Sequence, residues 1–173
     1  MTATVGQRTL LFLTGLFLLV GAGCSAPKFE REWKQALARG APAKGIEGPW
    51  EGLWKSDATG HTGGLRCLVS APEDRPAPWA FHYWFSWGGL QGSRGTSYTV
   101  REDNGVFRFS GEADLGVLGG VYRHEGRATA DSFEASYHAE KDRGTFRMMR
   151  PAPAAVAGGS SARSIRRYRR RQP

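Results

Sequence analysis

The chain has 173 residues, of which 40% are hydrophobic and 12% aromatic, and its 24 glycines favour one domain of short strands and tight turns over a helical bundle. Residues 24–160 carry 17 basic groups against 16 acidic ones, so the net charge of +8 comes from the ends of the chain and does not indicate a nucleic-acid-binding fold. The two cysteines allow at most one bridge, which excludes a disulfide framework.

Residues 1–23 are predicted to form an export signal. Arg8 gives a positive start, residues 10–20 form an uncharged apolar run, and three small residues precede Cys24. The run is about half of the ~20 residues that a helix needs to span a bilayer. The stretch resembles a bacterial lipoprotein signal, with VGAGC (residues 20–24) as its lipobox. This resemblance implies cleavage before Cys24 and attachment of lipids to that cysteine.

Two other interpretations of this segment stay open, namely an uncleaved apolar anchor and an ordinary signal that is cleaved near Ala26. The lipidated form is favoured because the signal pattern and the cysteine coincide. Ser25, which follows the cysteine, favours the outer membrane under the sorting rule of bacteria with two membranes. We therefore predict an exported protein that is anchored through Cys24 on the periplasmic side, with the outer membrane favoured.

Residues 24–48 are predicted to hold the anchor, a short helix and a linker. The helix spans residues 27–40, since proline suits its start and Gly40 its end. An apolar stripe recurs every four residues, at Phe29, Trp33 and Leu37. The stripe could pack on the rest of the protein, plug one end of a barrel, or lie on the membrane beside the lipid. The polar face mixes Glu with Lys and Arg, which favours packing.

From Pro49 onward the pattern has period two, which is typical of strands. Eight strands are predicted, over residues 49–57, 64–70, 79–87, 96–102, 106–112, 120–127, 132–140 and 144–150. Residues 88–95 are interpreted as a glycine-rich connection, residues 113–120 as a bent or bulged passage, and Asn104-Gly105 as a hairpin turn. Successive hairpins predict an all-β domain over residues 49–151, an eight-stranded antiparallel up-and-down barrel whose closure removes the exposed edges.

Five aromatic residues alternate along the third predicted strand and share one face: Trp79, Phe81, Tyr83, Phe85 and Trp87. They are predicted to face the barrel interior together with Trp50, Trp54, Tyr137, Phe146 and Met148. Two interpretations stay open. The rings could line a pocket for a small hydrophobic ligand, or they could fill the barrel outright, because eight strands leave little room. The crowding slightly favours a filled core.

The segment from Gly48 to Pro151 resembles the calycin-like barrels, the lipocalin and avidin group, through Gly52-Leu53-Trp54 in the first strand and an arginine, Arg147 or Arg150, in the last. The resemblance implies that this arginine covers Trp54 in a cation–π contact. The phrases WEGLWKSDATGHTGGLRC and LGVLGGVYRHEG also resemble a group of uncharacterised bacterial lipoproteins with a small barrel. That resemblance implies the anchor and the fold and supplies no activity.

The sequence contains no recognisable catalytic motif. The histidines, at positions 61, 82, 124 and 138, are more than four residues from one another and from any cysteine, so no local metal-ligand spacing exists. His82 and His138 are expected to face solvent. Ser93 lacks the glycine of a nucleophile elbow, and Cys67 alternates with apolar residues, which predicts a buried, inert thiol. No catalytic residue, cofactor or metal site is predicted, and we do not expect an enzyme.

Residues 152–173 are predicted to be a disordered linker with a basic tip. The tip could bind anionic lipid or a cell-wall polymer, or be solvated without a dedicated target; a nucleic-acid partner is not expected for an exported protein. The residues that would make the anionic contact are Arg166, Arg167, Arg169, Arg170 and Arg171. The function predicted first is an envelope lipoprotein whose barrel binds a small hydrophobic ligand. The alternative is a non-catalytic structural lipoprotein with a filled barrel.

Overall fold

The computed structural model describes residues 25–42, 45–74, 76–114 and 120–152. Cys24, the basic tail and most of the predicted bent passage lie outside these ranges. The elements are, in chain order, α2 (Ser25–Arg39), β1 (Gly48–Ser56), β2 (Thr62–Ser70), β3 (Trp79–Trp87), β4 (Leu90–Asp103), β5 (Val106–Asp114), β6 (Val121–Ala128), β7 (Ser132–His138) and β8 (Arg143–Met149).

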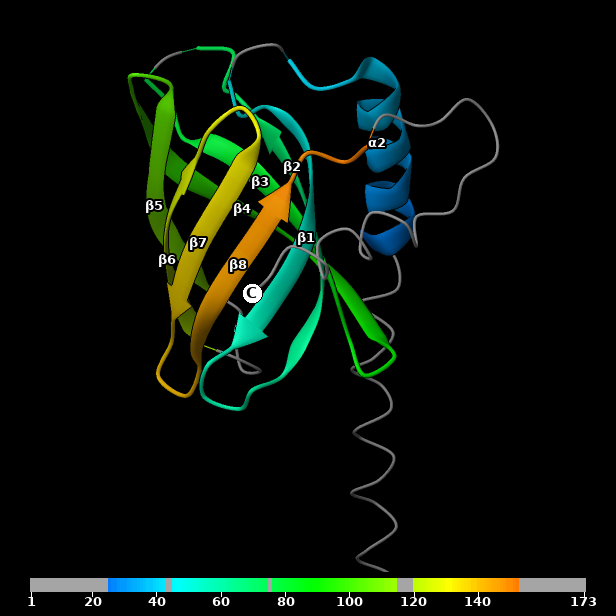
Figure 1. Ribbon diagram of the computed structural model, residues 1–173, viewed down its shortest axis with the longest axis vertical. Helices are drawn as coiled ribbons and strands as arrows, with labels where there is room; N and C mark the ends of the chain where they lie inside the picture. The colour runs from blue at the N-terminus through cyan, green and yellow to red at the C-terminus, as the bar shows by residue number, and fades with distance from the viewer. Residues whose placement is uncertain (1–24, 43–44, 75, 115–119, 153–173) are drawn as a thin grey trace, which may run out of the picture.

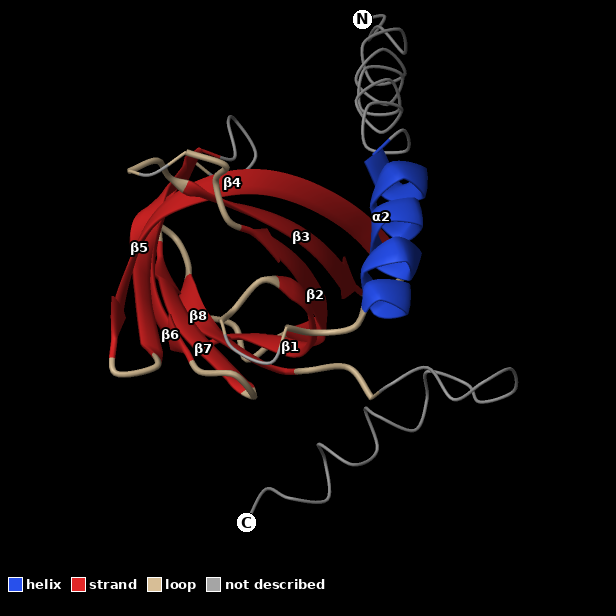
Figure 2. Cartoon of the chain, turned by 90° about the horizontal axis from the view of Figure 1, so that it is seen from above, coloured by secondary structure: helices blue, strands red, loops and turns tan. Residues whose placement is uncertain are grey.

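The strands form a closed barrel in which every neighbouring pair is antiparallel (Figure 1). Pairing of β1 with β8, from Glu51↔Met149 to Ser56↔Gly144, closes the ring. The prediction of an eight-stranded antiparallel barrel preceded by one helix is therefore confirmed, and the barrel is compatible with a calycin-like fold. Figure 2 shows α2 outside the ring of strands.

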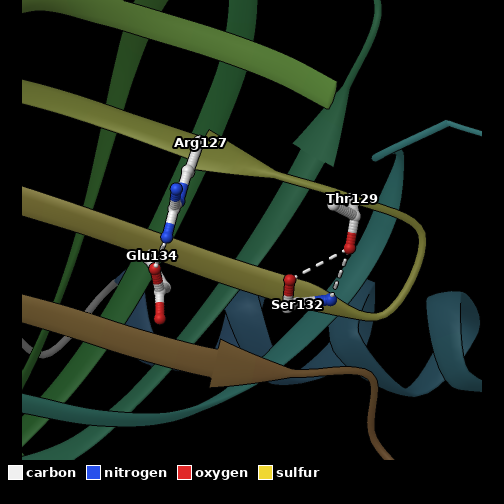
Figure 3. Close-up of polar contacts among 4 residues, drawn as sticks. All are labelled: Arg127, Thr129, Ser132 and Glu134. Atoms are coloured by element: carbon white, nitrogen blue, oxygen red, sulfur yellow. Dashed lines mark hydrogen bonds and ion pairs between the residues drawn. The ribbon is translucent and has the colours of Figure 1, made fainter. Parts of the chain in front are cut away.

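Two hairpin turns show how local chemistry sets the register. Asn104 and Gly105 both have positive φ, at 49° and 79°, as the predicted Asn-Gly turn between β4 and β5 requires. Between β6 and β7, the Thr129 hydroxyl accepts a hydrogen bond from the Ser132 amide at 3.2 Å (Figure 3). The same hairpin carries an ion pair on its outer surface, Arg127 to Glu134 at 2.8 Å. Because side chains alternate, this register turns residues 124, 126 and 128 inward.

The predicted connection over residues 88–95 was wrong. β4 begins at Leu90 and pairs with β3 as far as Trp87↔Leu90, so the turn consists of Gly88 and Gly89 alone. Gly92 lies in the strand, opposite Phe85. A glycine fits this position because the Phe85 ring lies over it, and a Cβ there would meet that ring at 2.7 Å. Glycine here accommodates packing, which from the sequence is indistinguishable from a loop. The resulting β3–β4 hairpin projects beyond the rest of the barrel wall (Figure 1).

α2 packs on the outside of the barrel wall, as the mixed charges of its polar face favoured, and not in a barrel end. Phe29, Trp33 and Ala36 are buried. The Arg66 guanidinium, on β2, lies over the Trp33 ring at 5.3 Å and over Trp84 at 4.8 Å. Rings that flank a cation in this way join helix and sheet by both dispersion and cation–π attraction.

α2 also corrects one expectation about the histidines. His82 points out of the barrel but is covered by the helix: its Nδ1 lies 3.1 Å from the Glu32 carboxylate, and the Phe29 ring meets it edge-on with centroids 5.0 Å apart. The sequence pattern predicted solvent on this face because nothing in it showed where the helix would lie. His138, by contrast, is exposed as expected.

The cation–π contact occurs on Trp50, not on Trp54 as the resemblance implied. The Arg150 guanidinium carbon lies 3.8 Å from the Trp50 ring centroid. Trp50 is also preceded by a glycine two residues earlier, Gly48, and it lies four residues before the tryptophan expected to make the contact. Trp54 lies further along β1 and donates its indole N–H to the Ser86 carbonyl at 3.1 Å. Arg147 faces outward and is exposed.

Arg150 seals the end of the barrel at which β1 begins, hereafter the Arg150 end. Its guanidinium donates hydrogen bonds to four backbone carbonyls, those of Gly45, Glu47, Pro49 and Ala130, at 2.8–3.2 Å. Partial burial lowers its pKa to about 10, which leaves the group charged at neutral pH. A single side chain thus joins the start of β1, the end of β8 and the β6–β7 turn.

We expect Arg150→Met to lower the free energy of unfolding by about 2–4 kcal/mol, because several carbonyls lose a charged donor and Trp50 loses its cation. Arg147→Met, the same exchange on the exposed face of β8, is expected to cost less than about 0.5 kcal/mol. Urea unfolding followed by tryptophan fluorescence measures both. Equal stability of the two variants would contradict the sealing role of Arg150.

Candidate functional site

The barrel interior divides into two halves of different character. The half at the Arg150 end is tightly packed with aromatic rings. The centroid of the Phe81 ring lies 4.7 Å from that of Tyr98 and 5.2 Å from that of Phe109. The centroid of the Phe133 ring lies 4.9 Å from that of Phe109 and 5.6 Å from that of Trp50. Centroid distances of this size are those of rings in direct contact. In this half the aromatic side chains fill the barrel, as one of the two interpretations of the sequence expected.

The other half lies at the end of the barrel where the β3–β4 turn is, hereafter the hairpin end. Its inward side chains include Trp54, Tyr83, Tyr122, His124, Tyr137 and Phe146. His124 lies among four rings, at centroid distances of 5.6 Å from Tyr98, 5.7 Å from Phe146, 6.3 Å from Tyr122 and 6.4 Å from Tyr137. Trp54 and Phe146 are only partly buried, so this half is less closed than the first.

Three polar atoms in the barrel interior have no hydrogen bond of standard geometry among the described residues: the hydroxyls of Tyr83 and Tyr98, and Nδ1 of His124. The Tyr83 hydroxyl is nevertheless close enough to the Tyr98 hydroxyl and the Cys67 thiol to interact with them weakly, and His124 interacts with the Tyr122 backbone. Burial is the main cause that raises the pKa of both tyrosines. Buried polar groups are nearly always paired, because leaving one unpaired costs about 1–3 kcal/mol. Three such groups therefore leave hydrogen-bonding capacity in the interior that the described residues do not fully use.

The rim of the hairpin end is held by Asp142. The Ser56 hydroxyl donates to one carboxylate oxygen at 2.7 Å and the Tyr137 hydroxyl donates to the other at 3.1 Å. Burial, and then the hydrogen bond to Asp142, raise the pKa of Tyr137. These contacts tie the β7–β8 turn to β1 and fix the Tyr137 ring beside His124.

Burial lowers the pKa of His124 from 6.5 to about 4, so the imidazole is neutral at pH 7. A neutral imidazole has one donor and one acceptor nitrogen. The interior of the hairpin end thus offers the Tyr83 hydroxyl and the His124 imidazole, and the Tyr98 hydroxyl lies where the two halves meet; all three groups are uncharged and lie within an aromatic lining.

The His124 shift predicts a pH dependence of stability. Between pH 6.5 and about 4 the unfolded chain binds a proton that the folded chain excludes, so the free energy of unfolding falls as the pH falls, by up to about 3 kcal/mol. His124→Gln should remove this component, and His138→Gln, at the exposed histidine of β7, should keep it. Urea unfolding at pH 7.5, 6, 5 and 4 gives the comparison. Parallel loss of stability in wild type and His124→Gln would contradict the assignment.

Most of the ring residues predicted to be interior are so placed. Trp50, Trp79, Phe81, Tyr83 and Met148 belong to the buried core. Tyr137 is buried at the hairpin end, whereas Trp54 and Phe146 are partly buried there and pack against the core. Two predictions were wrong: Phe85 is 42% exposed and Trp87 45% exposed. Phe85 is the last residue of β3 that pairs with β2, opposite Leu65, whereas Trp87 pairs with β4 alone. Phe85 therefore lies at the rim of the barrel and Trp87 extends past it.

Two residues of the site, Tyr122 and His124, were missed by the sequence analysis. A signal for them existed in the predicted strand over residues 120–127, where they alternate with Arg123 and Glu125 on the opposite face. A face composed of Tyr, His and Gly is less apolar than a core strand usually is. Their polar side chains are the reason that the pattern did not indicate a core position, and the reason that they differ from the apolar lining around them.

Among the described residues we find no candidate nucleophile or metal site in addition to these groups. Cys67 is buried, and burial raises its pKa well above the usual value, so it is a thiol and a poor nucleophile. Among the residues that the structure describes, no three His, Cys, Asp or Glu side chains come together as metal ligands. No helix within the described ranges has the length and apolar character required to cross a membrane.

Two hollows lie away from these polar groups. A groove of about 690 Å³ runs between the C-terminal half of α2 and the outer wall, and a second hollow of about 370 Å³ lies beside Trp79 and Phe107 at the Arg150 end. Neither is lined by the unpaired polar atoms.

Comparison of the chain with protein-family models, with curated proteins and with solved structures finds no match in any of the three.

Proposed function

We propose that this protein is an exported envelope lipoprotein whose barrel binds a small, partly hydrophobic molecule at its hairpin end. The observation that carries the proposal is the trio of buried, unpaired polar atoms on Tyr83, Tyr98 and His124. Binding sites for small molecules combine a mostly apolar lining with a few well-placed polar groups. The resemblance to uncharacterised bacterial lipoproteins with a small barrel supports the lipoprotein part of the proposal and not the ligand.

The lining suggests the chemistry of the ligand. Aromatic rings from Trp54, Tyr122 and Phe146 favour an apolar or ring-containing body. The two hydroxyls and the neutral imidazole favour a hydroxyl, carbonyl or amide group at its inner end. The interior groups named here are uncharged at pH 7, so a neutral molecule would not leave a buried charge unpaired.

A second candidate function is a non-catalytic structural lipoprotein with a filled barrel. The tight ring packing at the Arg150 end favours it, since that half leaves no gap between Phe81, Phe109 and Phe133 comparable to a ligand. The two candidates differ in whether the hairpin-end half encloses a guest. A ligand-binding experiment on variants of that half therefore separates them.

We expect the full chain to bind N-phenyl-1-naphthylamine, a neutral apolar fluorescent probe, and Ala113→Phe to weaken that binding at least about tenfold, equivalent to about 1.4 kcal/mol. Ala113 faces inward near the hairpin end, opposite Tyr122, so the added ring would occupy the site. Ser110→Phe adds the same ring to the exposed face of β5 and should leave affinity unchanged. Fluorescence titration measures all three. Absence of binding, or equal weakening by both variants, would favour the structural alternative.

The anchor is a separate part of the proposal, because Cys24 lies outside the described residues. In a bacterial host, Cys24→Ser is expected to abolish both incorporation of labelled palmitate and the size change caused by signal cleavage. Cys67→Ala changes the other cysteine, which is buried, and should preserve both. The readouts are autoradiography and intact mass. Equal palmitate incorporation in the two variants would refute lipidation at Cys24.

The proposed location is the periplasmic side of the envelope, with the outer membrane favoured by Ser25. The arginines of the basic tip, which lie outside the described residues, are proposed to contact anionic lipid or a cell-wall polymer. Both groups are polyanions that attract clustered arginines at moderate salt. No nucleic acid, metal or cofactor forms part of the proposal.

A further inference from the structure

Large apolar side chains are exposed mainly at one end of the molecule. Among the described residues five of them are exposed, and four lie at the hairpin end: Phe85 (42%), Trp87 (45%), Leu90 (58%) and Val121 (47%). The fifth, Met149, lies at the Arg150 end. Three of the four surround the tip of the β3–β4 hairpin, hereafter the apolar tip (Phe85, Trp87 and Leu90). Exposed apolar groups that gather in one place usually mark a surface that contacts something apolar.

The apolar tip carries no charge. The chain from Phe85 to Ser93 reads FSWGGLQGS, and the first charged residue after it is Arg94. The hairpin pairs its own backbone groups across the turn, from Phe85↔Gly92 to Trp87↔Leu90. Transfer of residues 85–93 into an apolar environment would therefore desolvate no ionised side chain of their own and few unpaired backbone groups. The ring that packs on Trp87, at a centroid distance of 5.2 Å, is that of His61.

The chain enters the structure from the same side. The N-terminal part of α2 lies towards the hairpin end, because Glu30 bonds Arg66 at 2.9 Å and Arg66 lies opposite Trp84. The C-terminal half of α2 lies instead near Ser70 and Ala80, towards the Arg150 end. In Figure 1 the dark blue start of α2 is accordingly its lower end, on the side to which the hairpin projects. The residue immediately before α2 is Cys24.

We propose that the apolar tip inserts into the surface of the bilayer that holds the Cys24 lipids, which turns the hairpin end of the barrel towards the membrane. The inference rests on the lipid anchor of the proposed function. A tryptophan at a projecting tip suits this role, since tryptophan concentrates at membrane–water interfaces. The less closed half of the barrel, with the partly buried Trp54 and Phe146, then faces the bilayer, from which a hydrophobic molecule would approach it.

The test uses the lipidated full chain in phosphatidylcholine vesicles at high salt, which suppresses any contribution from the basic tail. A polarity-sensitive nitrobenzoxadiazole label is attached at Leu90→Cys or, as the matched control, at Met149→Cys, the exposed apolar residue of the opposite end. Cys67 is buried and escapes labelling, and Cys24 is acylated. Tip insertion predicts a blue shift at position 90, loss of iodide quenching and quenching by nitroxide-labelled lipid. Position 149 should keep its aqueous emission and its iodide quenching.

The outcomes separate this inference from the anchor on which it rests. A chain that sediments with the vesicles while its position 90 label stays in water would overturn tip insertion and leave the anchor intact. A chain that does not sediment with the vesicles would overturn the anchor and the inference together. A label at position 90 that is shielded from iodide but not quenched by nitroxide lipid would assign the apolar tip to contact between two copies of this chain, and would also overturn the proposal.

Discussion

The stacking of the Arg150 guanidinium on the Trp50 indole, at 3.8 Å, is the contact on which the closed barrel depends. It lies where the first and last strands meet, and the four carbonyls that the same guanidinium bonds belong to the start of the barrel and to the β6–β7 turn. A barrel has no free edge only while its first and last strands stay paired. The residues that join them are 100 positions apart in the chain, so this contact contributes long-range order that no local hairpin provides.

The sealed end has a consequence for the opposite end. With Trp50, Phe81, Phe109 and Phe133 packed against one another, one half of the interior is a solid core that stabilises the fold. The other half is free to carry groups that a core would exclude, among them a buried histidine with a pKa of about 4. Because the contacts that close the barrel and the polar lining lie at different ends, the polar lining can exist without weakening closure. The half with the polar lining, the apolar tip and the start of α2 all lie on one side.

Much of the fold was predictable from the sequence because strand periodicity is a local property. Trp79, Phe81 and Tyr83 face inward as alternation required, and Asn104-Gly105 forms the expected turn. The failures share a different cause. Gly92 was assigned to a loop because the sequence does not show that the Phe85 ring would lie over it. Phe85 and Trp87 were assigned to the interior because alternation gives the face of a strand but not where the neighbouring strands end.

The assignment of the cation–π contact to Trp54 failed for the same reason. Trp50 and Trp54 have the same parity on one strand, and only the pairing of β1 with β8 shows which of them Arg150 reaches. By itself, the sequence determined the strand count, the alternation, the helix and the absence of a familiar catalytic motif, since each of these is written in neighbouring residues. Only the tertiary structure decided which rings share the core, that His124 is buried, and that apolar residues and the chain entry meet at one end. Those features depend on where distant strands stop and pair, which short-range chemistry does not specify.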